Sequence, residues 1–142
     1  MKVSECMSPD VEIASPDDSL RDVARTMREI DAGSMPVGEN DRLVGMITDR
    51  DIAIRAVAEG LGPDTPVRGI MSTDIRWCFE DEDVEEVAEQ MADYKIRRLP
   101  VLSREKRLIG MISLGDLSQA DGASSGEALR EISEPGGMHS QH

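Results

Sequence analysis

The residues of this sequence that could bind a small molecule belong to one pattern that occurs twice. Each copy is an apolar run interrupted by one glycine, closed by a hydroxyl residue and followed three positions later by an aspartate. The first copy spans residues 43–51 (LVGMITDRD) and the second spans residues 108–116 (LIGMISLGD). A short apolar run of this kind predicts a buried strand that leads directly into a helix.

Two interpretations of this Thr/Ser-x-x-Asp junction are compatible with each other. Thr48 and Ser113 can cap the first backbone N–H groups of a helix, and Asp51 and Asp116 can return a hydrogen bond to the cap, as in a capping box. A hydroxyl at a helix N-terminus also favours an anion such as phosphate. The aspartate one turn later can accept hydrogen bonds from ribose hydroxyls, as acidic residues do in dinucleotide folds. The duplication favours a binding site.

The duplication extends well beyond the junction. Val3 to Val37 matches Val67 to Val101 without a gap, and one extra residue in the 103–106 turn then shifts the alignment by one. A repeat of this length predicts two copies of one structural unit. In each copy we expect a strand, a helix, a hairpin of two strands and a second helix, which makes an α/β (α+β) fold. The expected strands span 11–13, 34–37, 42–47, 75–78, 98–102 and 107–112, and the expected helices span 20–31, 49–59, 84–94 and a stretch from 114 onward.

Local signals set several of these boundaries. Ser19 is the predicted N-cap of the first helix, whose inner face we expect to hold Leu20, Val23, Ala24, Met27 and Ile30. Gly60 is placed as a C-terminal glycine should be after the second helix. The last helix is weaker than its counterpart because it contains Gly115 and Gly122.

The ordered set of motifs resembles a known family. Met-Ser-x-Asp, an amphipathic helix, x-Pro-Val and the Gly-Met-Ile strand with its Thr/Ser-x-x-Asp ending, all present twice, are similar to a tandem pair of CBS domains, a Bateman module of the stand-alone type. The resemblance implies two pseudo-symmetric β-α-β-β-α repeats packed as one module with two clefts. The expected bounds are 3–62 for the first CBS domain, 67–122 for the second, and 123–142 for a partly disordered tail.

The resemblance also implies a ligand and its contacts. The clefts of this family bind adenosine-type molecules such as AMP, ADP, ATP, NAD or S-adenosylmethionine, as regulatory ligands and not as obligatory cofactors. By motif position, Thr48 and Ser113 would contact phosphate, and Asp51 and Asp116 would contact the ribose. The adenine edge and the pocket walls would be formed near Val11, Ile13, Pro36, Val37, Ile75, Pro100 and Val101.

Three arginines are candidates for the phosphate contact. Arg97 and Arg98 lie where the family often has a basic residue, and a guanidinium suits a bidentate phosphate contact. The first copy has Gly33 and Ser34 at these positions, so the two clefts cannot be equivalent. Arg50 lies inside the first junction. The alternative for all three is an ordinary solvated role, with Arg97 and Arg98 pairing with surface acids.

Composition excludes several classes of partner. The chain has 29 Asp and Glu against 16 Lys and Arg, a formal net charge of −13, which repels nucleic acid and anionic membranes. No apolar run approaches the length of a membrane span. Cys6 and Cys78 lack CxxC spacing, and nothing resembles a signal peptide, so we expect reduced thiols and a cytoplasmic protein.

No arrangement of residues supports catalysis or a metal site. The only two histidines, His139 and His142, lie near the C-terminus, where we expect a solvated tail, and two ligands fall short of the usual metal set. The first functional hypothesis is a regulatory nucleotide-binding module that forms a homodimer through apolar helix faces. The second is a ligand-free dimeric adaptor that docks an unidentified protein target with the same helices. A third is an oligomerisation or stress-response protein with a solubilising acidic surface.

Overall fold

The computed structural model describes residues 1–120 of the chain. Those residues form two compact units, each described separately below. The amino unit is Glu12–Ile75, and the carboxyl unit combines Met1–Val11 with residues 76–120. The predicted tail at 123–142, with His139 and His142, lies outside the described residues.

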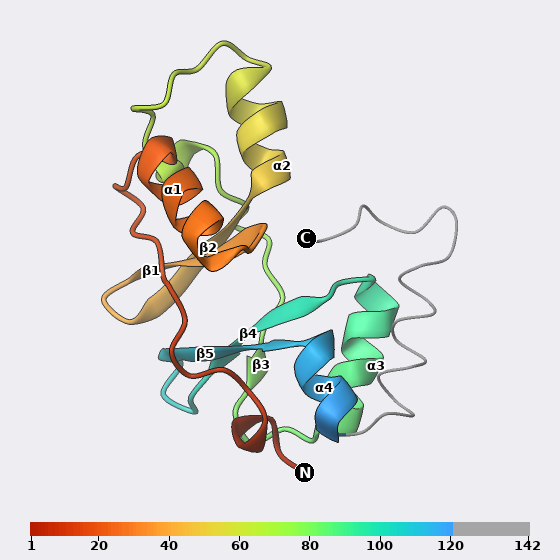
Figure 1. Ribbon diagram of the computed structural model, residues 1–142. Coiled ribbons are helices and arrows are strands. Elements are labelled where there is room, and N and C mark those ends of the chain that lie inside the picture. The colour runs from red at the N-terminus through yellow and green to blue at the C-terminus, as the bar shows by residue number, and fades with distance from the viewer. Residues whose placement is uncertain (121–142) are drawn as a thin grey trace. The chain divides into compact units, whose positions relative to one another are not determined.

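The amino unit is built on one antiparallel hairpin. Its strands are β1 (Ser34–Glu39) and β2 (Arg42–Thr48), joined by a two-residue turn in which both Asn40 and Asp41 have positive φ. Such turns match the twist of the strands they connect. The helix α1 (Leu20–Ile30) comes before the hairpin, and α2 (Asp49–Asp51) follows it and continues as a π-helical segment, Ile52–Val57 (Figure 1).

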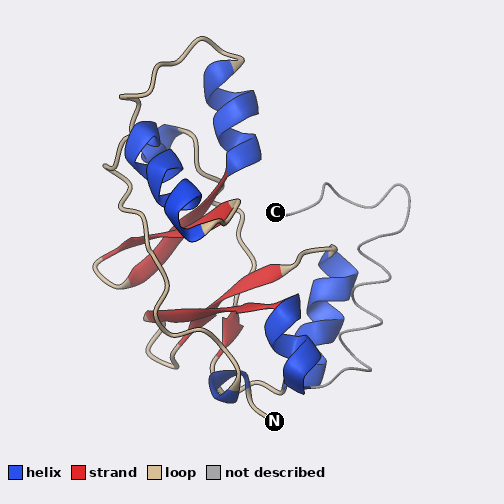
Figure 2. Cartoon of the chain, viewed as in Figure 1, coloured by secondary structure: helices blue, strands red, loops and turns tan. Residues whose placement is uncertain are grey.

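The carboxyl unit has a three-stranded sheet. The strand β3 (Cys78–Phe79) is parallel to β4 (Arg98–Leu102), and β4 is antiparallel to β5 (Leu108–Ser113). The helix α3 (Val84–Tyr94) connects β3 to β4, and α4 (Leu114–Ala120) follows β5 directly (Figure 2). The core of this unit joins α3 and α4 to one face of the sheet through aliphatic side chains and one thiol: Cys78, Val84, Val87, Met91, Leu99, Val101, Ile112 and Leu117.

Each compact unit contains the segment that begins the other sequence repeat. A 3₁₀ turn, Val3–Glu5, begins the chain, yet it packs in the carboxyl unit, where Ser8 and Met111 exchange two backbone hydrogen bonds of 2.8 and 3.0 Å. The second such turn, Val67–Gly69, packs in the amino unit, where Ser72 and Met46 exchange bonds of 2.8 and 2.9 Å. The bounds of the compact units therefore differ from those of the sequence repeats.

This exchange explains the glycine of the repeated strand. A Cβ at Gly45 would lie 2.7 Å from the Met71 sulfur and 2.9 Å from the Ser72 carbonyl oxygen. At Gly110 it would lie only 2.6 Å from the Ser8 carbonyl oxygen. A side chain at either position would push the incoming Met-Ser segment off the strand, so the Met-Ser and Gly-Met-Ile motifs are two halves of one contact.

Most of the predicted elements are confirmed. The helix 84–94 and the strand 98–102 have the expected bounds, and Ser19 caps α1 by accepting a hydrogen bond of 3.1 Å from the Asp22 N–H. Gly60 ends the second helix with φ +80°, a conformation that glycine adopts at low cost. Both cores are aliphatic, as three aromatic residues in 142 require.

Three expectations are wrong. The predicted strand 11–13 does not form, and only Ala14 makes a bridge, to Val37, because the chain passes from one compact unit to the other between Val11 and Glu12. The predicted strand 75–78 is Cys78–Phe79 for the same reason, since the next crossing falls between Ile75 and Arg76. On α1, Ala24 and Ile30 are exposed, because the helix contacts the core along a narrower face than predicted.

The second helix also departs from prediction. It has only three α-helical residues, and the backbone hydrogen bonds then change from the α-helical to the π-helical pattern at Ile52–Val57. Such insertions are invisible in the hydrophobic period of a sequence. Among the described helices, none has both the length and the apolar character needed to cross a membrane.

Candidate functional site

The first candidate junction lies where β2 becomes α2 in the amino unit. The Asp51 N–H donates to Thr48 Oγ1, and the Thr48 N–H donates to Asp51 Oδ2, both at 3.0 Å. This is a complete capping box. The cap uses the Thr48 hydroxyl only as an acceptor, so its proton is not needed for the cap.

The second junction, between β5 and α4 in the carboxyl unit, has the same plan with one difference. The Asp116 N–H donates to Ser113 Oγ at 3.2 Å, and the Ser113 N–H donates to Asp116 Oδ2 at 2.9 Å. Here the Ser113 hydroxyl also donates to Asp116 Oδ2, at 3.1 Å. In both junctions the cap ends on Oδ2, which leaves the other carboxylate oxygen, Oδ1, outside the capping box.

The residues across the hairpin from the two hydroxyls differ in charge. Ser34 pairs with Thr48, and Arg98 pairs with Ser113, in equivalent antiparallel registers. Directly opposite residues in an antiparallel pair share one face of the sheet. Ser34 is only 4% exposed, and its hydroxyl has no hydrogen-bond partner within residues 1–120, whereas Arg98 is half-buried. One junction therefore has a cation beside its hydroxyl and the other a small neutral side chain.

The other two arginines occupy different positions. Arg97 is half-buried, and its carbonyl oxygen accepts a hydrogen bond of 3.0 Å from the first N–H of α4, at Leu114. Its counterpart Gly33 accepts the same bond, 2.9 Å, from Asp49 at the start of α2. Arg50, in the first turn of α2, is exposed.

Because side chains alternate along a strand, the residues predicted to form the pocket walls lie on opposite faces of each sheet. Pro36 lies on the Ser34 face of its hairpin, and Pro100 lies on the Arg98 face of β4. Val37 and Val101 point the opposite way, fully buried in the two cores. Each unit thus brings together a hydroxyl, an aspartate and a proline: Thr48, Asp51 and Pro36 in the amino unit, and Ser113, Asp116 and Pro100 in the carboxyl unit.

The residues predicted near the adenine edge are divided between the units. Val11 belongs to the carboxyl unit, and Ile13 and Ile75 belong to the amino unit. Ile13 is 44% exposed, while Val11 and Ile75 are half-buried. Sequence reasoning missed two aromatic side chains of the carboxyl unit, Trp77 and Phe79, whose rings meet edge to face with centroids 4.8 Å apart. The available signal was their alternation around buried Cys78.

A CBS domain model matches residues 3–57 and 67–122 of this chain. The chain belongs to the CBS domain family. The CBS domain-containing protein YhcV of Bacillus subtilis is 38% identical over 133 residues, which are 92% of this chain and 94% of that protein. The family resemblance and the mixed α/β fold with two CBS repeats are therefore confirmed.

Two solved structures of the family are also similar. The CBS domain pair of protein MJ0100, in complex with methylthioadenosine and S-adenosyl-L-methionine, matches with a TM-score of 0.73 and 27% identity over 87% of this chain and 97% of that one. The cytosolic domain of the Mg²⁺ channel MgtE, in complex with ATP, matches with a TM-score of 0.72 and 27% identity over 84% of this CBS chain. That match covers 48% of the MgtE chain.

The pKa of each of the two thiols of this CBS protein is raised above its usual value. Burial raises the pKa of Cys78 to about 12, with a smaller contribution from the nearby Glu82 carboxylate, and burial also raises the pKa of Cys6. The thiolate is the reactive form of cysteine, so a raised pKa lowers the fraction of each side chain that is nucleophilic near neutral pH. Within residues 1–120, no three His, Cys, Asp or Glu side chains are grouped so that they could hold a metal ion.

Proposed function

We propose that this protein is a regulatory module that binds an adenosine-containing ligand at its strand-to-helix junctions. The observation behind the proposal is the matched pair of capping boxes, in which Asp51 and Asp116 each cap with Oδ2 and keep Oδ1 outside the cap. A carboxylate oxygen in that position is an acceptor for a ribose hydroxyl. The ligands found in the MJ0100 and MgtE structures support the class of molecule.

The chemistry of the two junctions suits different parts of such a ligand. The aspartates accept hydrogen bonds from the vicinal hydroxyls of the ribose. Phosphate oxygens accept from the Thr48 hydroxyl proton and, at the other junction, from the Arg98 guanidinium, which forms strong charge-assisted bonds. Among AMP, ADP, ATP, NAD and S-adenosylmethionine, a ligand regulates only by binding one conformation of the protein more tightly than another.

A thermal-unfolding panel with these five ligands tests the function. A ligand present at one hundred times its dissociation constant should stabilise the protein by about 2.7 kcal/mol. Asp51→Asn and Asp116→Asn should lower the shift, because an amide oxygen can replace the cap acceptor while the amide weakens the ribose contact. Asp49→Asn, on the exposed side of the same turn, is the matched control and should leave the shift unchanged.

No stabilisation by any of the five ligands would contradict the proposal and favour a ligand-free adaptor. An equal loss of stability with and without ligand in Asp51→Asn would have the same meaning, because it would leave the aspartate only its capping role.

A specific surface supports self-association, whichever of these functions holds. The second helix of the amino unit presents Ile54 and Val57 to solvent, with exposures of 53% and 68%, and Leu61, just after the helix, is 45% exposed. Exposed apolar patches of this kind mark interaction sites. We propose a second copy of this chain as the occupant, because a twofold axis lets one stripe pack against itself.

A further inference from the structure

The helix α1 of the amino unit has a row of cations on its solvent side. Arg21, Arg25 and Arg28 recur at helical spacing, and all three are exposed. Residues three or four positions apart lie next to each other on a helix surface, so the three guanidinium groups form a basic stripe. Arg21 contacts the Asp64 carboxylate at 2.6 Å, whereas Arg25 and Arg28 form no ion pair within residues 1–120.

The corresponding helix of the carboxyl unit, α3, is acidic instead. Glu85, Glu89 and Asp93 recur along one face, Glu86 lies beside them, and all four carboxylates are exposed. These residues form an acidic stripe. Like charges four positions apart destabilise a helix. In the part of the chain that the structure describes, none of the four carboxylates forms an ion pair, so no cationic side chain there offsets their repulsion.

The two stripes occupy equivalent places in the two repeats. The aligned repeats have Glu85 at the position of Arg21 and Glu89 at the position of Arg25. The acids that flank these positions are alike in the two helices, so the sign of the charge changes only along the stripe. Each chain therefore presents two complementary surfaces on two copies of one structural unit.

A second copy of this chain is the partner that fits both stripes at once. In a twofold dimer, a surface of one protomer contacts a different surface of its partner twice, once in each direction. A contact between α1 of one protomer and α3 of its partner thus brings arginines to carboxylates at both places. The alternative twofold contacts, α1 with α1 or α3 with α3, place like charges opposite each other, which disfavours them.

We propose that two copies of this chain associate head to tail, with the basic stripe of α1 in one protomer on the acidic stripe of α3 in its partner. The inference goes beyond the proposed function and does not depend on which ligand binds. The charged contact is also separate from the apolar stripe of Ile54, Val57 and Leu61. A chain that uses both surfaces forms an assembly larger than a dimer.

Charge reversal in the full chain tests this orientation, with self-association measured by sedimentation equilibrium. One variant combines Arg25→Glu with Arg28→Glu, and the other combines Glu85→Arg with Glu89→Arg. Each should weaken self-association about tenfold or more, because each places like charges across the contact. An equimolar mixture of the two variants should recover most of the lost affinity, since the reversed positions again face opposite charges.

Matched controls change the net charge by the same amount outside the two helices. They are Lys106→Glu with Arg107→Glu, and Asp10→Arg with Glu12→Arg, all at exposed positions. Both controls should leave self-association unchanged, and circular dichroism shows whether each variant is folded.

Salt separates the charged contact from the apolar one. Raising NaCl from about 0.05 M to about 0.5 M should weaken the charged contact, because ions screen exposed charges. This salt-dependent association should persist in Val57→Asp, which weakens only the apolar contact. Association that neither the two reversals nor salt alters would overturn this inference and leave the apolar dimer intact. A mixture of the two variants that stays as weak as each alone would also overturn it. Neither result bears on the thermal shifts that test ligand binding.

Discussion

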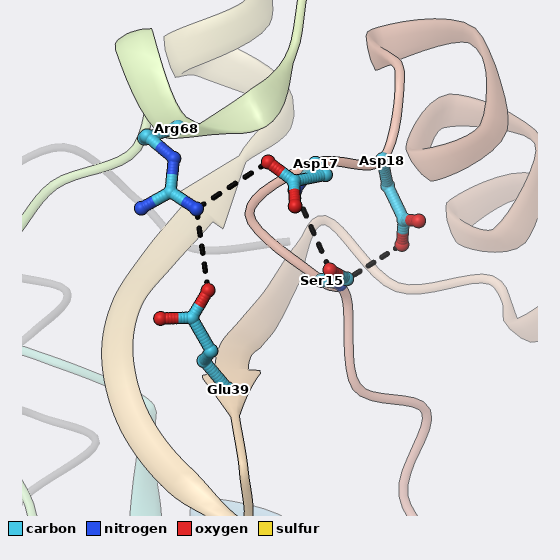
Figure 3. Close-up of polar contacts among 5 residues, drawn as sticks. All are labelled: Ser15, Asp17, Asp18, Glu39 and Arg68. Atoms are coloured by element: carbon cyan, nitrogen blue, oxygen red, sulfur yellow. Dashed lines mark hydrogen bonds and ion pairs between the residues drawn. The ribbon is translucent and has the colours of Figure 1, made fainter.

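The two units of this CBS protein share equivalent backbone hydrogen bonds to the incoming segment, but different ion pairs form at their exposed turns. In the amino unit, Arg68 from the incoming segment donates to Asp17 Oδ1 at 3.3 Å and to Glu39 Oε2 at 3.2 Å (Figure 3). In the carboxyl unit, the equivalent aspartate, Asp81, instead forms two 2.8 Å contacts with Arg104 from the β4–β5 turn.

The backbone beneath these side chains is the same. The Val67 N–H donates to the Asp18 carbonyl and the Arg68 N–H to the Pro16 carbonyl, both at 2.9 Å. In the other unit Val3 donates to Glu82 and Ser4 donates to Glu80, also at 2.9 Å. The two repeats therefore share the same backbone hydrogen bonds but differ in the exposed charged side chains above them. Exposed ion pairs stabilise little, so they can change without loss of the fold.

The largest expected difference between the units comes from adding a methyl group at the glycines of their repeated strands, Gly110 and Gly45. Gly110→Ala should destabilise the protein by about 1–3 kcal/mol, because its Cβ would meet the backbone oxygen of Ser8. Gly45→Ala should cost less, since its Cβ would lie 2.9 Å from the nearest backbone atom, the Ser72 oxygen, against 2.6 Å at Gly110, and its other neighbour is the flexible side chain of Met71. Urea unfolding followed by circular dichroism measures both.

Gly69→Ala is the matched control for this pair, because nothing lies within 4 Å of the Cβ it would add. Its unfolding free energy should stay within about 0.5 kcal/mol of the wild type. Equal values for Gly110→Ala and the control would show that the close approach of the Met-Ser segment is unimportant.

A second difference between the repeats lies at the exposed apolar stripe of the amino unit, Ile54, Val57 and Leu61. The sequence has Gln119, Gly122 and Gly126 at the positions that correspond to Ile54, Val57 and Leu61. Val57→Asp should weaken self-association about tenfold or more, because a carboxylate would have to be desolvated in the interface. Sedimentation equilibrium measures the change. The control is Glu59→Gln, which changes an exposed residue of the turn that follows the same helix, and a monomeric wild type would refute the dimer.

The smallest expected effect concerns the charged turns. The hydrogen bond from Arg104 holds the pKa of Asp81 below its usual value, so this pair stabilises the folded state above the unfolded pKa of aspartate, about 3.9. That contribution is lost as the pH falls through the lower folded-state pKa. Arg104→Ala should therefore lower the urea midpoint at pH 6 and match the wild type near pH 2. A difference that persists at pH 2 would assign the effect to packing of Arg104 on Phe79 instead.

Local chemistry made much of this fold predictable. The helix Val84–Tyr94 follows from its apolar period, the start of α1 from the capping hydroxyl of Ser19, and the end of the second helix from the backbone freedom of Gly60. The two capping boxes were also predictable, because residues three positions apart at a helix start meet through local geometry alone. The nonequivalence of Ser34 and Arg98 was visible in the aligned repeats.

What the sequence by itself determined is the set of local elements and the fact of duplication, since both depend on neighbours within a few residues or on simple comparison. Only the tertiary structure decided that Met7-Ser8 and Met71-Ser72 pack on the other repeat's strand, and that Cys78 pairs with Val101. These contacts join segments far apart in the chain, and no periodicity within either segment specifies its partner or its register.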